Sequence, residues 1–138
     1  METYDRATIE RALSMTREAE YRLGEAFDRL NSAENWGVAD ILGGGLITTF
    51  VKHAHADGAE ASIREARRLL DLVQRMMPQE RLDAPESDGY GFARTAYWLF
   101  DGLLADLCMQ RRLSASKAAV EKLIGRVRLL RTRLERCL

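Results

Sequence analysis

The sequence predicts an all-α protein: a four-helix bundle, with or without an antiparallel coiled-coil extension made by two of its helices. Apolar residues recur at steps of three and four along most of the chain, which is the spacing of one helix face. The two prolines, Pro78 and Pro85, lie in the same short stretch, so long helices are permitted on either side. A chain of 138 residues with 46% hydrophobic and 30% charged residues is typical of a single globular domain, here 1–138.

The first helix is expected over residues 5–34. Its apolar face consists of Ile9, Leu13, Thr16, Leu23, Phe27 and Leu30. Gly24 lies inside this helix, where glycine costs about 1 kcal/mol relative to alanine, and it predicts a close contact with a neighbouring element. The helix is expected to end where cap-forming and turn-forming residues gather, at Asn31, Ser32, Asn35 and Gly37.

A triple glycine, Gly43 to Gly45, separates the first helix from the second. Glycine gives the backbone access to positive φ, so a turn, a kink or a close backbone approach is expected here. The second helix is predicted from Leu46 to about Met77, with a seam whose steps alternate between four and three: Ala59, Ile63, Ala66, Leu70, Val73 and Met77. Residues 78–91 hold both prolines and two glycines and are predicted to form a long loop.

The third helix is predicted from Phe92 to about Arg112 and is the most apolar of the four, so it is expected at the centre of the core. The last helix follows after residues 113–116, which either break the helix or continue it. Its apolar positions are Val120, Leu123, Ile124, Val127, Leu130 and Leu134. A weak echo between residues 35–77 and 92–134 is compatible with a duplication, although two amphipathic helices also match by chance.

Charge is balanced overall but not along the chain. The formal net charge is zero, which gives no overall field that would attract nucleic acid or an anionic membrane. After Leu107 many basic residues face only Glu121 and Glu135, whereas the N-terminal part is acidic. Pairing of an acidic helix with a basic one explains this pattern. Nucleic-acid association through the arginine-rich last helix is the alternative, although the basic residues surround an apolar stripe instead of forming one patch.

Several other features indicate where the protein is located and what it does not bind. Cys108 and Cys137 lie on different predicted helices and form no C-x-x-C pair, so we expect cytosolic thiols. The N-terminus lacks a signal peptide pattern, and the longest uncharged run, 41–51, is too short to span a bilayer. We therefore expect a cytoplasmic protein without a membrane association. No cofactor is expected.

One polar cluster is a candidate metal site. His53 and Asp57 are four residues apart, so they share one face of a helix, with Glu60 three residues further on. Imidazole and carboxylate groups at this spacing bind divalent metals or form an acid/base pair, and Asp101 and Asp106 of the third helix would complete a site if the four side chains converge. The E-x-x-H pairs of di-iron bundles are missing. An aspartate paired with Lys52 or His53 inside the bundle, or a solvent-exposed histidine and carboxylate, explains the same residues without a metal.

A second set of residues indicates a structural motif around the glycines. It comprises Trp36, Gly37, Asp40, Gly43, Gly44, Gly45 and Lys52. A phosphate-binding loop requires G-x-x-x-x-G-K-[ST], and Lys52 lies seven residues after Gly45, so that motif fails. We expect the glycines to allow close packing of another element against the backbone.

The same stretch resembles a known group. Residues 35–59 match a W-G-x-x-D-x-x-G-G-G core followed by a K-H step and an aspartate, and Phe100, Asp101 and Asp106 match an F-D-x-x-x-x-D segment. These patterns resemble a family of uncharacterised helical proteins of bacteria, and the resemblance covers about 35–135. It implies a helical fold and a bacterial cytosolic origin, and no reaction.

These observations lead to a functional hypothesis. The seam at Ala59 to Met77 and the lack of a complete catalytic set predict a non-catalytic interaction or scaffold protein, which associates with itself or with another helical protein. A small metal-binding or ligand-binding bundle, with or without enzymatic activity, is the first alternative. Nucleic-acid association is the second.

Overall fold

The computed structural model describes residues 4–43, 46–77, 100–107 and 113–138, and for Glu34 and residues 36–54 it describes the backbone alone. These parts form an all-α helical bundle, so the predicted fold class is confirmed. The elements are α1 (Arg6–Gly43), α2 (Leu46–Met76), a short helical segment at 100–107 and α4 (Leu113–Arg136). The predicted loop at 78–91 and the first part of the predicted third helix lie outside the described residues.

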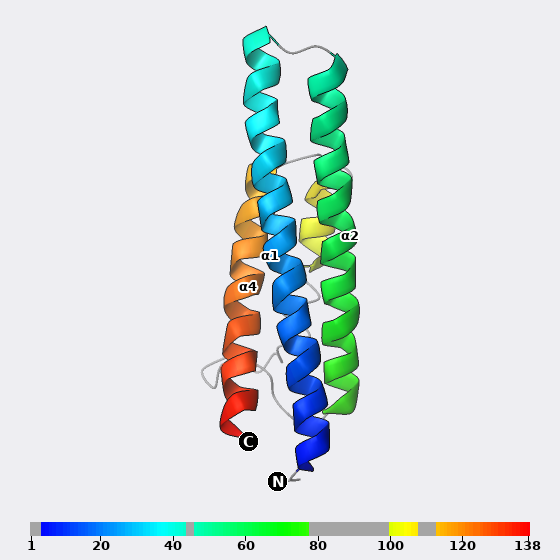
Figure 1. The fold of residues 1–138 in the computed structure, drawn as a ribbon, viewed down its shortest axis with the longest axis vertical. Coiled ribbons are helices and arrows are strands. Elements are labelled where there is room, and N and C mark those ends of the chain that lie inside the picture. The colour runs from blue at the N-terminus through cyan, green and yellow to red at the C-terminus, as the bar shows by residue number, and fades with distance from the viewer. Residues whose placement is uncertain (1–3, 44–45, 78–99, 108–112) are drawn as a thin grey trace.

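The helices are long and run nearly along one axis. α1 packs against both α2 and α4, which lie on either side of it, and both run in the direction opposite to α1 (Figure 1). The segment 100–107 is seen between α1 and α2, set back from both, and all four elements contribute side chains to one core. Both termini lie at the same end of the bundle.

α1 begins at a side-chain cap. The carboxylate of Asp5 accepts a hydrogen bond from the backbone N–H of Thr8 at 2.8 Å, which satisfies one of the free donors of the first turn. The expectation that this helix ends near Asn31 is wrong, because α1 continues to Gly43. Leu30 and Ala33 are fully buried, and the side-chain oxygen of Asn31 accepts a hydrogen bond from Nζ of Lys117 at 3.0 Å. These contacts thus keep α1 helical at residues that would otherwise favour a helix end.

The expected close contact at Gly24 is also absent. A Cβ atom at this position would meet nothing within 4 Å, so the glycine makes room for no neighbour. Packing of the residues around it, including the fully buried Leu23, keeps this stretch helical despite the glycine.

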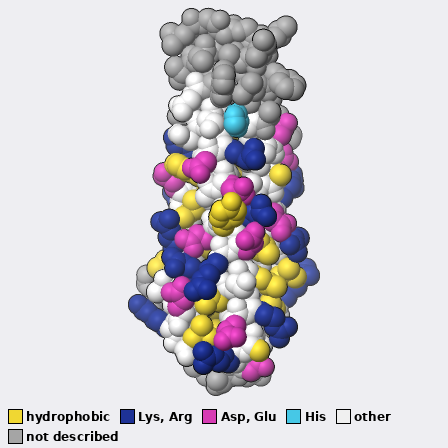
Figure 2. Space-filling model, viewed as in Figure 1, with side chains coloured by type: hydrophobic (Ala, Val, Ile, Leu, Met, Phe, Trp, Pro, Cys, Tyr) yellow, Lys and Arg dark blue, Asp and Glu magenta, His cyan; other side chains and the backbone are white. Residues whose placement is uncertain are grey.

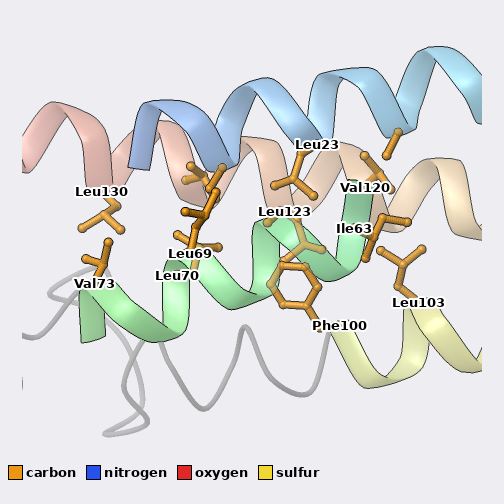
Figure 3. Close-up of a cluster of buried hydrophobic side chains, with 14 of the residues drawn as sticks. Leu23, Ile63, Leu69, Leu70, Val73, Phe100, Leu103, Val120, Leu123 and Leu130 are labelled. Atoms are coloured by element: carbon orange, nitrogen blue, oxygen red, sulfur yellow. The ribbon is translucent and has the colours of Figure 1, made fainter. Parts of the chain in front are cut away.

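The break at the triple glycine and the second helix agree with the predictions. α1 ends at Gly43 and α2 begins at Leu46. Every residue of the predicted α2 seam is buried, and side chains from all four elements converge on it (Figure 3). The large side chains of this core with under 2% exposure are Leu23, Leu30, Ile63, Val73, Met77, Phe100, Leu103, Leu107, Val120, Leu123, Leu130 and Leu134.

The contact between α1 and α2 is made by small side chains. From Ala12 to Ala33 every seventh residue of α1 is a fully buried alanine, and we call Ala12, Ala19, Ala26 and Ala33 the alanine seam. Its side of α1 faces α2, because Arg29, which lies on that side, packs against Gly58 of α2. On α2 the buried Ala59 and Ala66 continue the pattern. Small side chains at a helix contact allow the two axes to approach to the lower end of the usual range of about 8–10 Å.

α4 begins at Leu113, so residues 113–116 are helical and the alternative that they break the helix is wrong. The side chains of Val120, Leu123, Val127, Leu130 and Leu134 are buried as predicted, and Ile124 is partly buried against the core. The segment 100–107 buries Phe100, Leu103, Leu104 and Leu107, which agrees with a central third helix.

α1 and α2 run on past the beginning of α4 (Figure 1). Lys117 of α4 contacts Phe27 and Asn31 of α1, and α4 begins only four residues earlier, about 6 Å along the axis. The last residues of α1 and the first of α2 therefore extend beyond α4 as an antiparallel helix pair. We call residues 36–43 and 46–51 the hairpin tip. By sequence, the stretch 36–51 contains one charged residue, Asp40.

Candidate functional site

The structure does not gather the carboxylates of the predicted metal site. Asp101 is exposed and forms an ion pair with Arg67 of α2, with Oδ1 2.8 Å from Nη1. Asp57 is exposed and lies ten residues before Arg67 on α2, about 15 Å along the helix, so Asp57 and Asp101 lie at different levels. Asp106 is half-buried in the π-helical turn that ends 100–107. The side chain of His53 is outside the described residues.

Within the described ranges, no three His, Cys, Asp or Glu side chains are placed to hold a metal ion together. Since His53 is not among them, the metal site stays a prediction. Asp101 pairs with Arg67, and the alternative of an aspartate paired with Lys52 or His53 involves side chains outside the described residues and stays a prediction. The helical spacing on α2 was visible in the sequence, but the level at which the third helix meets α2 was not.

The residues of the predicted structural motif lie almost entirely outside the described side chains. Gly43 is the last residue of α1, Gly44 and Gly45 are not described, and the other members are described by their backbone alone. These other members are Trp36, Gly37, Asp40 and Lys52. The structure thus places the motif at the turn between α1 and α2, and its proposed packing role stays a prediction.

The contact between α1 and α4 carries a charged network. Nε of Arg128 donates a hydrogen bond to Oε1 of Glu20 at 3.0 Å, and Oε2 of Glu20 forms an ion pair with Arg131, whose Nε lies 2.8 Å away. Glu135 of α4 receives Nη1 of Arg131 at 3.2 Å and Nη2 of Arg17 at 3.3 Å. The side chain of Glu20 is only 21% exposed, so its ion pairs are better shielded from solvent than ordinary surface pairs. We call these five residues the charged network.

The charged network bears out pairing between an acidic and a basic helix at these positions. The network contains three arginines and two glutamates, so most of its positive charge is balanced within the chain and contributes little to a field that would attract nucleic acid. Lys117 lies over the ring of Phe27, with Nζ 5.5 Å from the ring centre, and also binds Asn31. Nucleic-acid association would thus depend on the remaining basic residues of α4, such as the exposed Lys122 and Arg136, and it stays a prediction.

Several ion pairs of the described residues lie along single helices. Arg6 pairs with Glu10, Arg22 with Glu18 and Glu25, Arg64 with Glu60, and Arg68 with Glu65. The face in Figure 2 accordingly shows positive and negative side chains interspersed below the undescribed end. Pairs of this kind stabilise an exposed helix by only a few tenths of a kcal/mol each.

The clear pKa shifts have the same local causes. The hydrogen bond from Thr8 lowers the pKa of Asp5, and the hydrogen bond from Arg68 lowers the pKa of Glu65. The pKa of Arg22 is raised by its hydrogen bond to Glu25, and that of Arg68 by its hydrogen bond to Glu65. All four groups lie on the outside of helices and act as caps or surface pairs. Shifts of this type are structural and differ from those of buried catalytic groups.

A surface pocket lies on the outer side of α1, next to the C-terminal residue. Its walls are made by Glu10, Leu13, Ser14, Arg17, Glu18, Tyr21 and Leu138. Arg17 already binds Glu135, and Glu18 binds Arg22, so the charged groups of the wall are engaged within the chain. The pocket offers an exposed tyrosine and a serine but no pair of nucleophile and base.

Comparison of the chain with protein-family models, with curated proteins and with solved structures gives no match. In the described part of the chain, none of the helices contains a stretch apolar and long enough to cross a membrane.

Proposed function

We propose that this chain is a non-catalytic helical interaction protein that associates with a second copy of itself. The observation that carries the proposal is that α1 and α2 run on past α4 as a helix pair whose end, residues 36–51, is almost free of charge. An apolar helix pair in water is stabilised when another surface covers it.

The sequence-based hypothesis of self-association rested on the α2 seam, and this seam is not free for a second copy. The α2 seam from Ala59 to Met77 is buried within the chain, with at most 6% exposure at any of its positions. A seam already packed in its own core offers nothing to a second copy. Self-association therefore requires another surface, and we propose the hairpin tip because its sequence is almost free of charge.

The distribution of charged side chains supports a non-catalytic role. Arg67 neutralises Asp101, and the charged network joins α1 to α4. These groups stabilise and orient helices, which is the ordinary use of charge in a bundle. Catalysis would instead require a nucleophile, acid or base held near a partner group and open to a substrate.

The mass of the protein in solution tests this proposal. Sedimentation or light scattering should show a reversible change from monomer to dimer as the concentration rises from micromolar towards millimolar. Added nucleic acid or divalent metal should leave this equilibrium unchanged. A chain that stays monomeric at every concentration would contradict self-association, and a stoichiometric metal in the purified protein would favour the metal-binding alternative.

A further inference from the structure

We draw no further inference here: the strongest candidate, the outer surface of α1 and α4 that carries the exposed side chains of Tyr21 and Leu129 and the open space at Gly24 and Gly125, is an unpartnered helix face, and nothing in the structure shows what covers it.

Discussion

The two sides of α1 are held by different kinds of contact. Towards α2, α1 presents the alanine seam, whose members are small and fully buried, and beside it Arg29, which packs against Gly58. Towards α4 it presents Phe27 together with the charged network, and the residues of α4 that these side chains contact are long and charged. The contact with α2 involves small side chains, and the contact with α4 involves long side chains of both charges. The stability of the protein should therefore fall when side-chain volume is added at the contact with α2, and when volume or charge is removed at the contact with α4.

The difference concerns the part of the bundle in which side chains are described. Helices that meet through small side chains bury backbone and side-chain surface without needing a large residue at each level. On the α4 side, contact depends on long side chains that reach across, and it ends with α4 itself.

Removal of a large side chain at the centre should have the largest effect. Leu123→Ala leaves a cavity in a fully buried position of α4 and should lower the free energy of unfolding by about 2–5 kcal/mol in urea denaturation. Leu129→Ala is the matched control on the same helix, because Leu129 is 60% exposed, and it should change the value by less than about 0.5 kcal/mol. Similar losses for the two variants would contradict the burial that defines this side.

Added volume in the alanine seam should come next. Ala26→Leu forces a large side chain between α1 and α2 and should lower the free energy of unfolding by about 1–3 kcal/mol. Ala61→Leu adds the same volume on the exposed face of α2 and should be neutral to within about 0.5 kcal/mol. If Ala26→Leu were tolerated as well as the control, the close contact of the two helices would be refuted.

Loss of charge in the network should be milder. Glu20→Gln removes the partner of two arginines and should destabilise by about 1 kcal/mol at low salt. The deficit should shrink near 1 M salt, where the screening length is about 3 Å. Glu18→Gln, which affects only a pair with Arg22 along α1, should cost at most about 0.5 kcal/mol. Denaturation at two salt concentrations separates the variants, and equal, salt-independent losses would argue against a network between helices.

Substitution of two glycines by alanine tests how closely α1 packs against α2. Gly24 has open space around its Cβ position, so Gly24→Ala should stabilise the protein by about 0.5–1 kcal/mol through helix propensity. Gly58 faces α1, and an added Cβ would lie 2.5 Å from Nη1 of Arg29, so Gly58→Ala should gain less because Arg29 must move. Thermal unfolding of the two variants ranks them, and a larger gain at Gly58 would contradict the close contact there.

The smallest effect concerns the cap of α1. The folded pKa of Asp5 is lowered from its ordinary value of 3.8, so its stabilising contribution is present above that value and is lost as pH falls through the folded pKa. Asp5→Asn keeps an N-cap acceptor without the charge. The wild type should therefore unfold at a slightly higher temperature than this variant near neutral pH, and the difference should vanish in acid. A difference that does not change with pH would rule out the charged cap.

Much of the fold was predictable because the spacing of large apolar residues along the sequence indicates which face of a helix is buried. The α2 seam, the buried positions of α4 and the break at the triple glycine followed from the spacing of leucine, isoleucine and valine and from glycine itself. The alanine seam was missed because alanine is common on every helix face. Its repeat of seven, at Ala12, Ala19, Ala26 and Ala33, was the signal that would have revealed it.

Two features that the sequence did not show share a physical cause. Asn31 looked like a helix end because its side chain competes with the backbone for hydrogen bonds, but the side chain of Lys117, far along the sequence, binds that of Asn31. Asp101 was assigned to the candidate metal site, which stays a prediction, and the ion pair that Asp101 forms with Arg67 could not be read from the sequence. Both outcomes depend on which levels of two helices meet, and this is set by the packing of the whole core rather than by local sequence.

Amide hydrogen exchange below and above the concentration at which the protein associates tests the central claim most directly. If two hairpin tips pack together, exchange in peptides covering 36–51 should slow as the concentration rises, while exchange in α4 and in the lower part of α2 stays unchanged. Protection that rises in α4 instead, or no dependence on concentration anywhere, would contradict the account.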